Sequence, residues 1–482
     1  MQQLIKILTA LLIKVVLIVL FLIPSNTEAQ RRSTSVSVSN GGKTTISIKN
    51  GLSNKFYIEY KGDITLSDDD SDVVGISRGG YMEIKKSAFG NRRRIIIEPN
   101  GSGQLVKKYY VGSSQRSFDA EGKKWLSEIL LEVVRTTTLG SEKRVDRMYR
   151  QGGSYKVLKE VDKIASDHVK ARYIKLLLDK DLKEKDLIAI LNTVGEDFDS
   201  DHHKADILKR NAKAFLASDN TTAAYIKAAS DINSDHHTAE VLKKSIRDGS
   251  ISNTQMKALF PIVDDIDSDH HKASVLNEVL RERNLDAENT KLLIATSKSI
   301  NSDHHKASVL KKALGKDLGS ATSHALLASV SNMSSDHHIA SVFLELVKQD
   351  LDASSKAHLL RLVEENMTSD NHQANVLKRM ATAHQIDESL PDYLGALTNI
   401  DSDHHKADVF KTLSRSTFSE KQLIAILGAT ESIDSDYHKA ETLIAFSSAV
   451  NGGSKAVADA YTDACMDIDS DSHLGRAIKA IN

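Results

Sequence analysis

Paired histidines recur along the C-terminal two thirds of this chain in a motif of the form Ser-Asp-His-His-Lys-Ala. Ten copies of its aspartate occur at intervals of 33 to 35 residues, and 16 of the 19 histidines lie one or two residues after such an aspartate. The ten residues are Asp167, Asp201, Asp235, Asp269, Asp303, Asp336, Asp370, Asp403, Asp436 and Asp471. Imidazole titrates near neutral pH and binds zinc, copper and nickel, so metal binding and pH sensing are the chemistry to consider.

The candidate metal ligands are the complete His-His pairs: His202, His203, His236, His237, His270, His271, His304, His305, His337, His338, His404 and His405. Adjacent residues on a helix do not face each other, and the motif has no second histidine four residues on, so one helix offers no chelating pair. Equivalent helices pack about 8 to 10 Å apart, so an ion bridges two repeats only if side chains converge. We therefore expect no cofactor. Zinc, copper or nickel is the alternative, and the pairs are otherwise a structural edge or a contact surface for a partner.

The fixed period predicts a repeat array in which each unit packs only on its neighbours. Counting from each aspartate, position −3 is apolar in all ten copies, position −1 is always Ser, position +4 is Ala or Gly, and position +7 is apolar. The spacing of +4 and +7 places them on one stripe of a helix that begins near the aspartate, with the serine as its cap and the aspartate beside the helix dipole. A second apolar stripe upstream predicts the other helix of a hairpin.

Residues 36–111 instead show alternation with period two, interrupted by turn signals such as Asn40-Gly41 and Gly79-Gly80. This pattern predicts an antiparallel meander of short strands. A helix from Asp119 should cover its apolar face, with Trp125 packed between sheet and solenoid. The predicted fold is α+β by domains, with a small N-terminal antiparallel sheet followed by an all-α solenoid of ten hairpins of about 34 residues.

The first residues have the pattern of a targeting signal. A basic start, an apolar stretch and a small-residue exit predict a secretory signal over residues 1–29, with cleavage after Ala29. An uncleaved membrane anchor is the alternative. The predicted domains are therefore residues 1–29 (signal), 30–115 (sheet), 116–153 (connecting helices) and 154–482 (solenoid), and we expect no membrane span in the mature chain.

Composition argues against several functions. The formal charge is −1 and Cys465 is the only cysteine, which speaks against nucleic-acid binding and excludes a disulfide within the chain. Motifs of zinc peptidases, serine hydrolases and phosphate-binding loops are absent, so we expect no enzyme. The acidic run at residues 68–72 lacks calcium-loop spacing and is interpreted as a solvated turn. The run Arg92-Arg93-Arg94 should pair across the sheet.

Some motifs resemble a known family. The repeated Ser-Asp-aromatic-x-Lys/Arg-Ala pattern, the Gly-Gly-Tyr-Met-Glu-Ile segment at residues 79–84 and the segment from Phe118 to Leu126 resemble the soluble region attached to bacterial membrane zinc peptidases of the β-lactam-sensor and antirepressor type. The resemblance covers roughly residues 62–482. It implies an extracytoplasmic repeat module without protease activity, because the peptidase helices and zinc motif are missing here.

These observations favour an exported, periplasmic or extracellular, non-enzymatic solenoid that binds a protein or peptide partner. The alternative is an envelope protein that binds or buffers metal through its histidine columns. A hydrolase whose site leaves no mark in the sequence is a third hypothesis.

Overall fold

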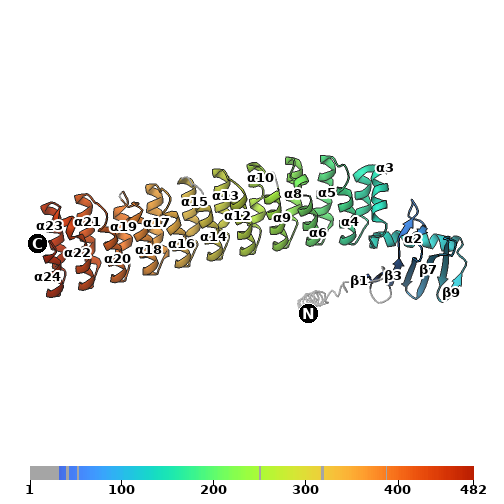
Figure 1. The fold of residues 1–482 in the computed structure, drawn as a ribbon, viewed down its shortest axis with the longest axis horizontal. Coiled ribbons are helices and arrows are strands. Elements are labelled where there is room, and N and C mark those ends of the chain that lie inside the picture. Colours follow the sequence, from blue (N-terminus) through green and yellow to red (C-terminus); the bar gives the residue numbers. More distant parts are fainter. Residues whose placement is uncertain are drawn as a thin grey trace, which may run out of the picture. The chain divides into compact units, whose positions relative to one another are not determined.

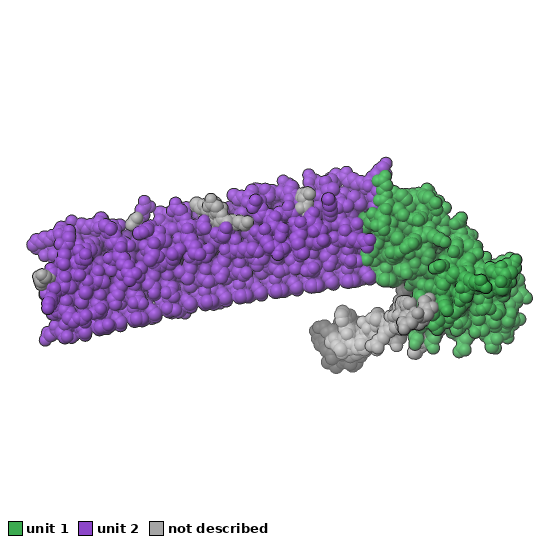
Figure 2. All heavy atoms as spheres, viewed as in Figure 1, with its two compact units in different colours: residues 1–181 green, residues 182–482 purple. Residues whose placement is uncertain are grey.

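The computed structural model describes residues 32–38, 43–50, 54–248, 251–315, 320–386 and 388–481. The predicted signal at residues 1–29 and the predicted Asn40-Gly41 turn lie outside them. The chain divides into two compact units, Met1–Asp181 and Leu182–Asn482 (Figure 2). No helix among the described residues is long and apolar enough to cross a membrane.

The first unit contains an antiparallel sheet. Within the described residues its strand order is β1-β2-β3-β6-β7-β8-β9, and β4 and β5 form a separate hairpin. The bounds are β1 Arg32–Val38, β2 Lys43–Asn50, β3 Asn54–Lys61, β4 Ile64–Leu66, β5 Val73–Ile76, β6 Tyr81–Ala88, β7 Asn91–Pro99, β8 Leu105–Val111 and β9 Ser114–Arg116. The antiparallel sheet is therefore confirmed, while the short strands β5 and β9 were not predicted.

One helix covers the apolar face of this sheet. Helix α2 (Ala120–Thr136) begins at Asp119, whose carboxylate accepts a hydrogen bond from the backbone N–H of Glu121. Trp125 is 6% exposed and packs against Tyr109, with ring centroids 5.6 Å apart. The tryptophan belongs to a core shared by α2 and the sheet, which provides the cover that a single sheet needs.

Two further helices complete the first unit. Helix α3 (Ser141–Val161) is interrupted at Gly152 and Gly153, where the backbone leaves helical geometry and Gly153 has φ of +64°. Helix α4 (Asp167–Leu178) begins at the first motif aspartate. Glycine tolerates such a left-handed conformation, so the pair divides α3 into two helical segments.

The second unit is entirely helical in its described residues, which confirms the predicted fold class. Every motif aspartate is the first residue of a helix. These downstream helices are α6 Asp201–Arg210, α9 Asp235–Asp248, α12 Asp269–Glu282, α14 Asp303–Leu314, α16 Asp336–Leu346, α18 Asp370–Thr382, α20 Asp403–Leu413, α22 Asp436–Asn451 and α24 Asp471–Lys479.

A second layer of helices precedes them. Figure 1 shows the two layers as parallel rows, in which each helix packs beside its counterpart in the next repeat. The upstream helices are α5 Glu184–Asp197, α8 Asp219–Ser230, α10 Asn253–Lys257, α11 Phe260–Asp264, α13 Ala287–Ser297, α15 Ser320–Val330, α17 Ala353–Asn366, α19 Leu390–Thr398, α21 Glu420–Ala429 and α23 Lys455–Met466. The shorter elements are α7 Ala212–Phe215 and the 3-10 helix η1 Thr430–Ser432.

The repeat core contains the residues that the period singled out. In the central repeats Ile300, Ala307 and Leu310 are each 0 to 1% exposed. The alanine at position +4 carries only a methyl group, so neighbouring downstream helices approach closely along this stripe. Burial of the same three positions in successive repeats makes one continuous apolar core along the unit.

Candidate functional site: an imidazole ladder

The histidine pairs lie in the first turn of each downstream helix. In α14, for example, Ser302 is the N-cap and Asp303 the first helical residue, followed by the two histidines. In five repeats the serine hydroxyl accepts from the backbone N–H of the histidine two residues after the aspartate, each time at 3.5 Å. This distance is long for a hydrogen bond, and in five other repeats the motif serine makes no side-chain cap bond, so the predicted serine cap is confirmed only in part and is weak.

The motif aspartate joins successive repeats, a role that its position in the sequence did not reveal. Asp269 accepts hydrogen bonds from the backbone N–H groups of Asn301 at 3.0 Å and Ser302 at 2.7 Å, both in the turn of the next repeat. These two groups precede a helix and have no partner within it. The carboxylate therefore caps the neighbouring turn as well as lying beside its own helix dipole.

This aspartate clamp is repeated along the second unit. At eight successive junctions, from Asp201 to Asp436, the carboxylate accepts from the serine N–H of the next motif at 2.6 to 2.9 Å. Because every junction has the same bond, successive helix starts keep the same offset. Side chains at equivalent positions consequently form straight columns along this edge.

The lysine at position +3 reinforces the junction from inside. Lys204 and Lys406 each donate to a backbone carbonyl of the next repeat at 2.7 Å, and Lys272 donates to the hydroxyl of Ser299 at 2.8 Å. Lys306 is 2% exposed, and burial lowers the pKa of its ammonium group. The lysine column is thus part of the scaffold beneath the histidines.

The histidine rings form a zigzag in two runs, which together we call the imidazole ladder. Within a repeat, the rings of His270 and His271 have centroids 5.2 Å apart. Between repeats, His270 lies 5.5 Å from His305, and His236 lies 5.5 Å from His271. Each first histidine therefore contacts its own partner and the second histidine of the following repeat, and most pairs meet edge to face.

The ladder corrects one geometric expectation and meets the condition attached to another. Adjacent histidines do meet, because side chains at a helix start lean past its N-terminus, where no preceding turn separates them. Rings of successive repeats also converge, although the helix axes are farther apart than the rings. Both contacts depend on the rotamers and on the junction offset, neither of which the sequence displays.

All twelve predicted histidines belong to the ladder. One run extends from His203 to His372 and a second from His405 to His473, with Tyr437 replacing one imidazole. His372, His438 and His473 also join, although they had not been named as candidates. Their position two residues after a motif aspartate was the signal that could have identified them.

The two columns of the ladder differ in environment. The first histidine of each pair is exposed and the second is half-buried. Burial lowers the pKa of His237, His271 and His338, and neighbouring imidazoles lower it further. Lys209 and Lys243 act in the same direction on His237 and His271, while Asp201 and Asp235 oppose them. These three second histidines are therefore held neutral more strongly than free histidine.

The ladder presents imidazoles in pairs. Among the described residues, no group of three His, Cys, Asp or Glu side chains is arranged to hold a metal ion. Protein zinc sites normally use three or four such ligands, whereas each contact point here supplies two. The exposed imidazoles can also form hydrogen bonds through their ring nitrogens and stack through their ring faces.

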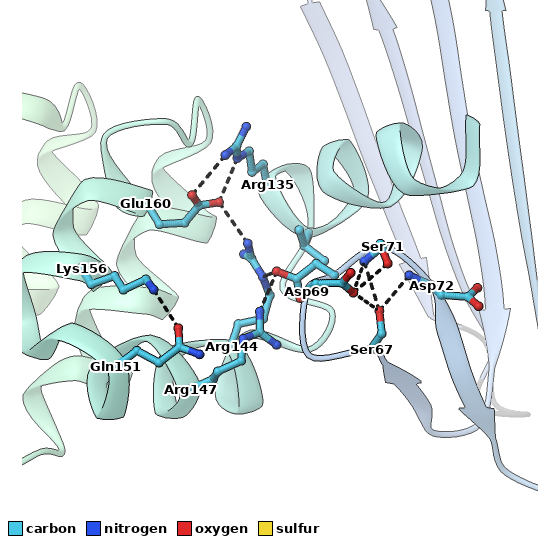
Figure 3. A network of polar contacts seen from close by, with 12 residues as sticks. Ser67, Asp69, Ser71, Asp72, Arg135, Arg144, Arg147, Gln151, Lys156 and Glu160 are labelled. Atoms are coloured by element: carbon cyan, nitrogen blue, oxygen red, sulfur yellow. Dashed lines mark hydrogen bonds and ion pairs between the residues drawn. The ribbon is translucent and has the colours of Figure 1, made fainter. Parts of the chain in front are cut away.

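The acidic run at residues 68–72 is only partly solvated. Asp68 and Asp69 are exposed, but Asp70 is 6% exposed and has φ of +61°. Its carboxylate accepts from Arg144 at 2.8 Å and from Arg147 at 2.7 Å. These bonds anchor the β4–β5 turn to α3, so the solvated-turn interpretation is wrong for Asp70. Figure 3 shows Arg144 and Arg147 beside this turn.

Arginine 144 connects this turn to a second buried acid. Its guanidinium donates to Glu160 at 3.0 Å, and Arg135 donates to the same carboxylate at 2.8 Å (Figure 3). Arg144 also donates to the hydroxyl of Tyr173 on α4. Buried charges paired in this way hold the elements of the first unit in one arrangement, and we assign the network a structural role.

Two other predictions concern reactive and basic side chains. Cys465 is fully buried in α23, where burial raises the pKa of its thiol to about 11, so it is a poor nucleophile. The arginine run does not pair with acids directly across the sheet. Arg93 is opposite Lys86 and Arg94 is opposite Lys85, but Arg94 contacts the carboxylate of Glu83 on the adjacent strand at 3.7 Å, so the prediction holds for Arg94 alone.

Neither a scan against protein-family models nor a search of curated proteins finds a match to this chain. The resemblance to the soluble region of membrane zinc peptidases therefore stays a prediction based on the motifs quoted above.

Proposed function

We propose that this chain is an exported, non-enzymatic scaffold of the bacterial envelope that binds an extended protein or peptide along the imidazole ladder. The observation that carries the proposal is the continuity of the ladder's first run, which places imidazole rings at contact distance from His203 to His372, with the first ring of each pair exposed. A surface that repeats the same group at a fixed interval suits a partner that is itself extended. The resemblance noted above supports the envelope location.

The scaffold does not require histidine at these positions. Asn371, Tyr437 and Ser472 occupy the first histidine's place, yet Asp370, Asp436 and Asp471 still begin helices there. The aspartate clamps into these turns are also present, at 2.6 to 2.9 Å. The start of each helix and the stacking of the repeats therefore do not explain why histidine occupies the exposed position in most repeats. Recognition by a partner would explain it.

Site-specific photo-cross-linking in the native envelope tests this proposal. A photoreactive residue at position 270 lies in the ladder, whereas one at position 384 replaces His384, an exposed histidine outside it. We expect the ladder position to capture a discrete protein or peptide, identified by mass spectrometry, and the control position to capture none. Equal capture at both positions, or none at position 270, would contradict a binding surface on this edge.

Metal capture is the second candidate, favoured by the ring spacing. Centroids 5.1 to 5.8 Å apart are compatible with two imidazoles on one zinc, copper or nickel ion, given metal–nitrogen bonds of about 2.0 Å. The ladder variant for this test is His236→Asn, His270→Asn and His304→Asn. The off-ladder control is His324→Asn, His358→Asn and His384→Asn, which removes as many imidazoles elsewhere.

Equilibrium dialysis of each ion against the full chain, purified without an affinity tag, distinguishes the two candidates. Metal capture predicts bound ion that is lost in the ladder variant and kept in the control variant. It also predicts that Asn371→His, which lies between the two runs, raises the amount of metal bound. Equal metal content in all variants, or no bound metal, would exclude capture by the ladder.

A further inference from the structure

A concentration of positive charge lies at one end of the sheet in the first unit, far along the sequence from the ladder. The antiparallel register places Lys85 opposite Arg94 and Lys86 opposite Arg93 on β6 and β7. On the neighbouring strand β3, Lys55 is opposite Ser87, which extends the basic area by one strand. Like charges directly opposite one another destabilise a sheet unless a counter-charge is supplied.

Nearby carboxylates compensate only part of this charge. Glu83 contacts Lys85 at 2.7 Å and Arg94 at 3.7 Å, so one acid serves two cations. On the other face, Lys86 pairs with Glu132 and Arg93 pairs with Glu121 at 3.4 Å, both from α2. The outer face of the β6–β7 end therefore has more cations than its own acids neutralise.

Two cations have no carboxylate at all within the described part of the chain. Lys55 and Arg92 are exposed, and neither takes part in an ion pair there. Arg92 begins the basic end of β7, and its backbone carbonyl accepts from the N–H of Gly112 at 2.8 Å. Its backbone is thus fixed in the sheet while its guanidinium remains available.

These side chains surround a recess of about 510 Å³. Its lining includes Lys55, Lys85, Lys86, Arg92, Arg93 and Arg94, and no Asp or Glu is among the lining residues that the structure describes. Aromatic rings hold two of the cations in place. The Lys85 ammonium lies 4.8 Å from the ring centroid of Tyr57, and the Arg94 guanidinium lies 4.1 Å from that of Tyr110.

We propose that this recess binds a multiply charged oxyanion of the phosphate type, free or carried by a lipid headgroup. Guanidinium groups donate two parallel hydrogen bonds to phosphate oxygens, and lysines add compact positive charge. The bound anion would supply the counter-charge that the register Lys85–Arg94 requires. Tyr57 and Tyr110 restrict two of the cations before binding, which reduces the entropy lost when the anion binds.

Binding of the free anion is tested by titrating the full chain with inorganic pyrophosphate. Isothermal titration calorimetry at low ionic strength measures the binding. The test variant is Arg92→Glu combined with Lys55→Glu, both at exposed positions. The control is Arg78→Glu, an exposed arginine before β6, at the strand end opposite the recess. We expect the test variant to bind about tenfold more weakly or worse, the control to bind as the unaltered chain does, and circular dichroism to show all three folded.

Sedimentation with vesicles of phosphatidylglycerol, compared with phosphatidylcholine vesicles, tests the lipid-borne form. Binding of anionic vesicles that the test variant loses and the control keeps would support a headgroup as the source. If the test variant lost pyrophosphate binding but vesicle binding did not change, a soluble phosphate would be supported as the source of the anion. Equal weakening by Arg78→Glu, or no binding of either probe by the unaltered chain, would overturn the proposal and leave the proposed function of the ladder untouched.

Discussion

Removing one aspartate clamp should loosen the array at a single junction. Asp269 is the clearest case, because its two carboxylate oxygens separately accept from the N–H groups of Asn301 at 3.0 Å and Ser302 at 2.7 Å. The substitution Asp269→Ala deletes both acceptors and leaves α12 with a better helix former in its first turn. Loss of the negative charge beside the dipole of α12 costs about 0.3 to 1 kcal/mol, so any larger loss of stability comes from the junction.

The size of the effect follows from these two bonds. A hydrogen bond to a charged group contributes about 1.5 to 3 kcal/mol, and here two N–H groups lose such a partner. Asn301 is exposed and Ser302 half-buried, so water replaces part of the lost interaction. We therefore expect Asp269→Ala to lower the free energy of unfolding by about 3 kcal/mol. Asp269→Asn should lower it by about half of that, because its single carbonyl oxygen keeps one acceptor.

Urea denaturation followed by the helical circular dichroism signal measures this loss. For a transition with a slope of about 3 kcal/mol/M, a loss of about 3 kcal/mol lowers the midpoint by about 1 M. The matched control is Asp267→Ala, which removes an exposed carboxylate two residues away and should change stability by less than about 0.5 kcal/mol. A midpoint for Asp269→Ala equal to that of the control would refute the clamp.

Three other predictions follow. The pKa of His237, His271 and His338 is lower in the folded chain than the value near 6.5 in the unfolded chain. As pH falls through this value, the unfolded chain therefore binds more protons than the folded chain, and the melting midpoint should be lower at pH 5 than at pH 8. Replacing these three by Asn should reduce that difference, and an unchanged difference would argue against the ladder as its source. Arg144→Leu should destabilise the first unit by about 3 to 5 kcal/mol, because it leaves the buried carboxylates of Asp70 and Glu160 without this partner. This loss of stability can be measured by urea unfolding, monitored by the fluorescence of Trp125, the only tryptophan. Iodoacetamide at pH 8 should label Cys465 at least tenfold more slowly in the folded chain than in urea, as mass spectrometry would detect, because burial raises its pKa to about 11.

The sequence predicted the helical hairpins because their determinants are local. Apolar positions at −3 and +7 and alanine at +4 specify which faces are buried, and Asp303 and its equivalents mark where helices begin. The missed strands lacked such a signal. Val73–Ile76 is short and contains Gly75, while Ser114–Arg116 is polar throughout, so neither shows the alternation typical of a half-buried strand.

The site was harder to predict because it depends on contacts between repeats. The bond from Ser302 to Asp269 joins residues 33 positions apart, and the contact between His270 and His305 joins equivalent turns. A sequence gives the interval between such residues but not the offset of one repeat against the next. Asp70 was misjudged for the same reason, since its partners Arg144 and Arg147 lie more than 70 residues away.

The natural exceptions within the ladder separate what each motif residue contributes. Tyr437 keeps ring contacts with His438 at 5.1 Å and with His473 at 5.8 Å, so an aromatic ring of another kind fits the same geometry. Asn371 has no ring and divides the ladder, yet the clamp from Asp336 into its turn is the shortest in the unit, at 2.6 Å. The aspartates therefore fix the columns, and the residues in the columns vary without altering them. Because of this, the exposed residues of the columns can change to suit a ligand while the stacking of the repeats is preserved.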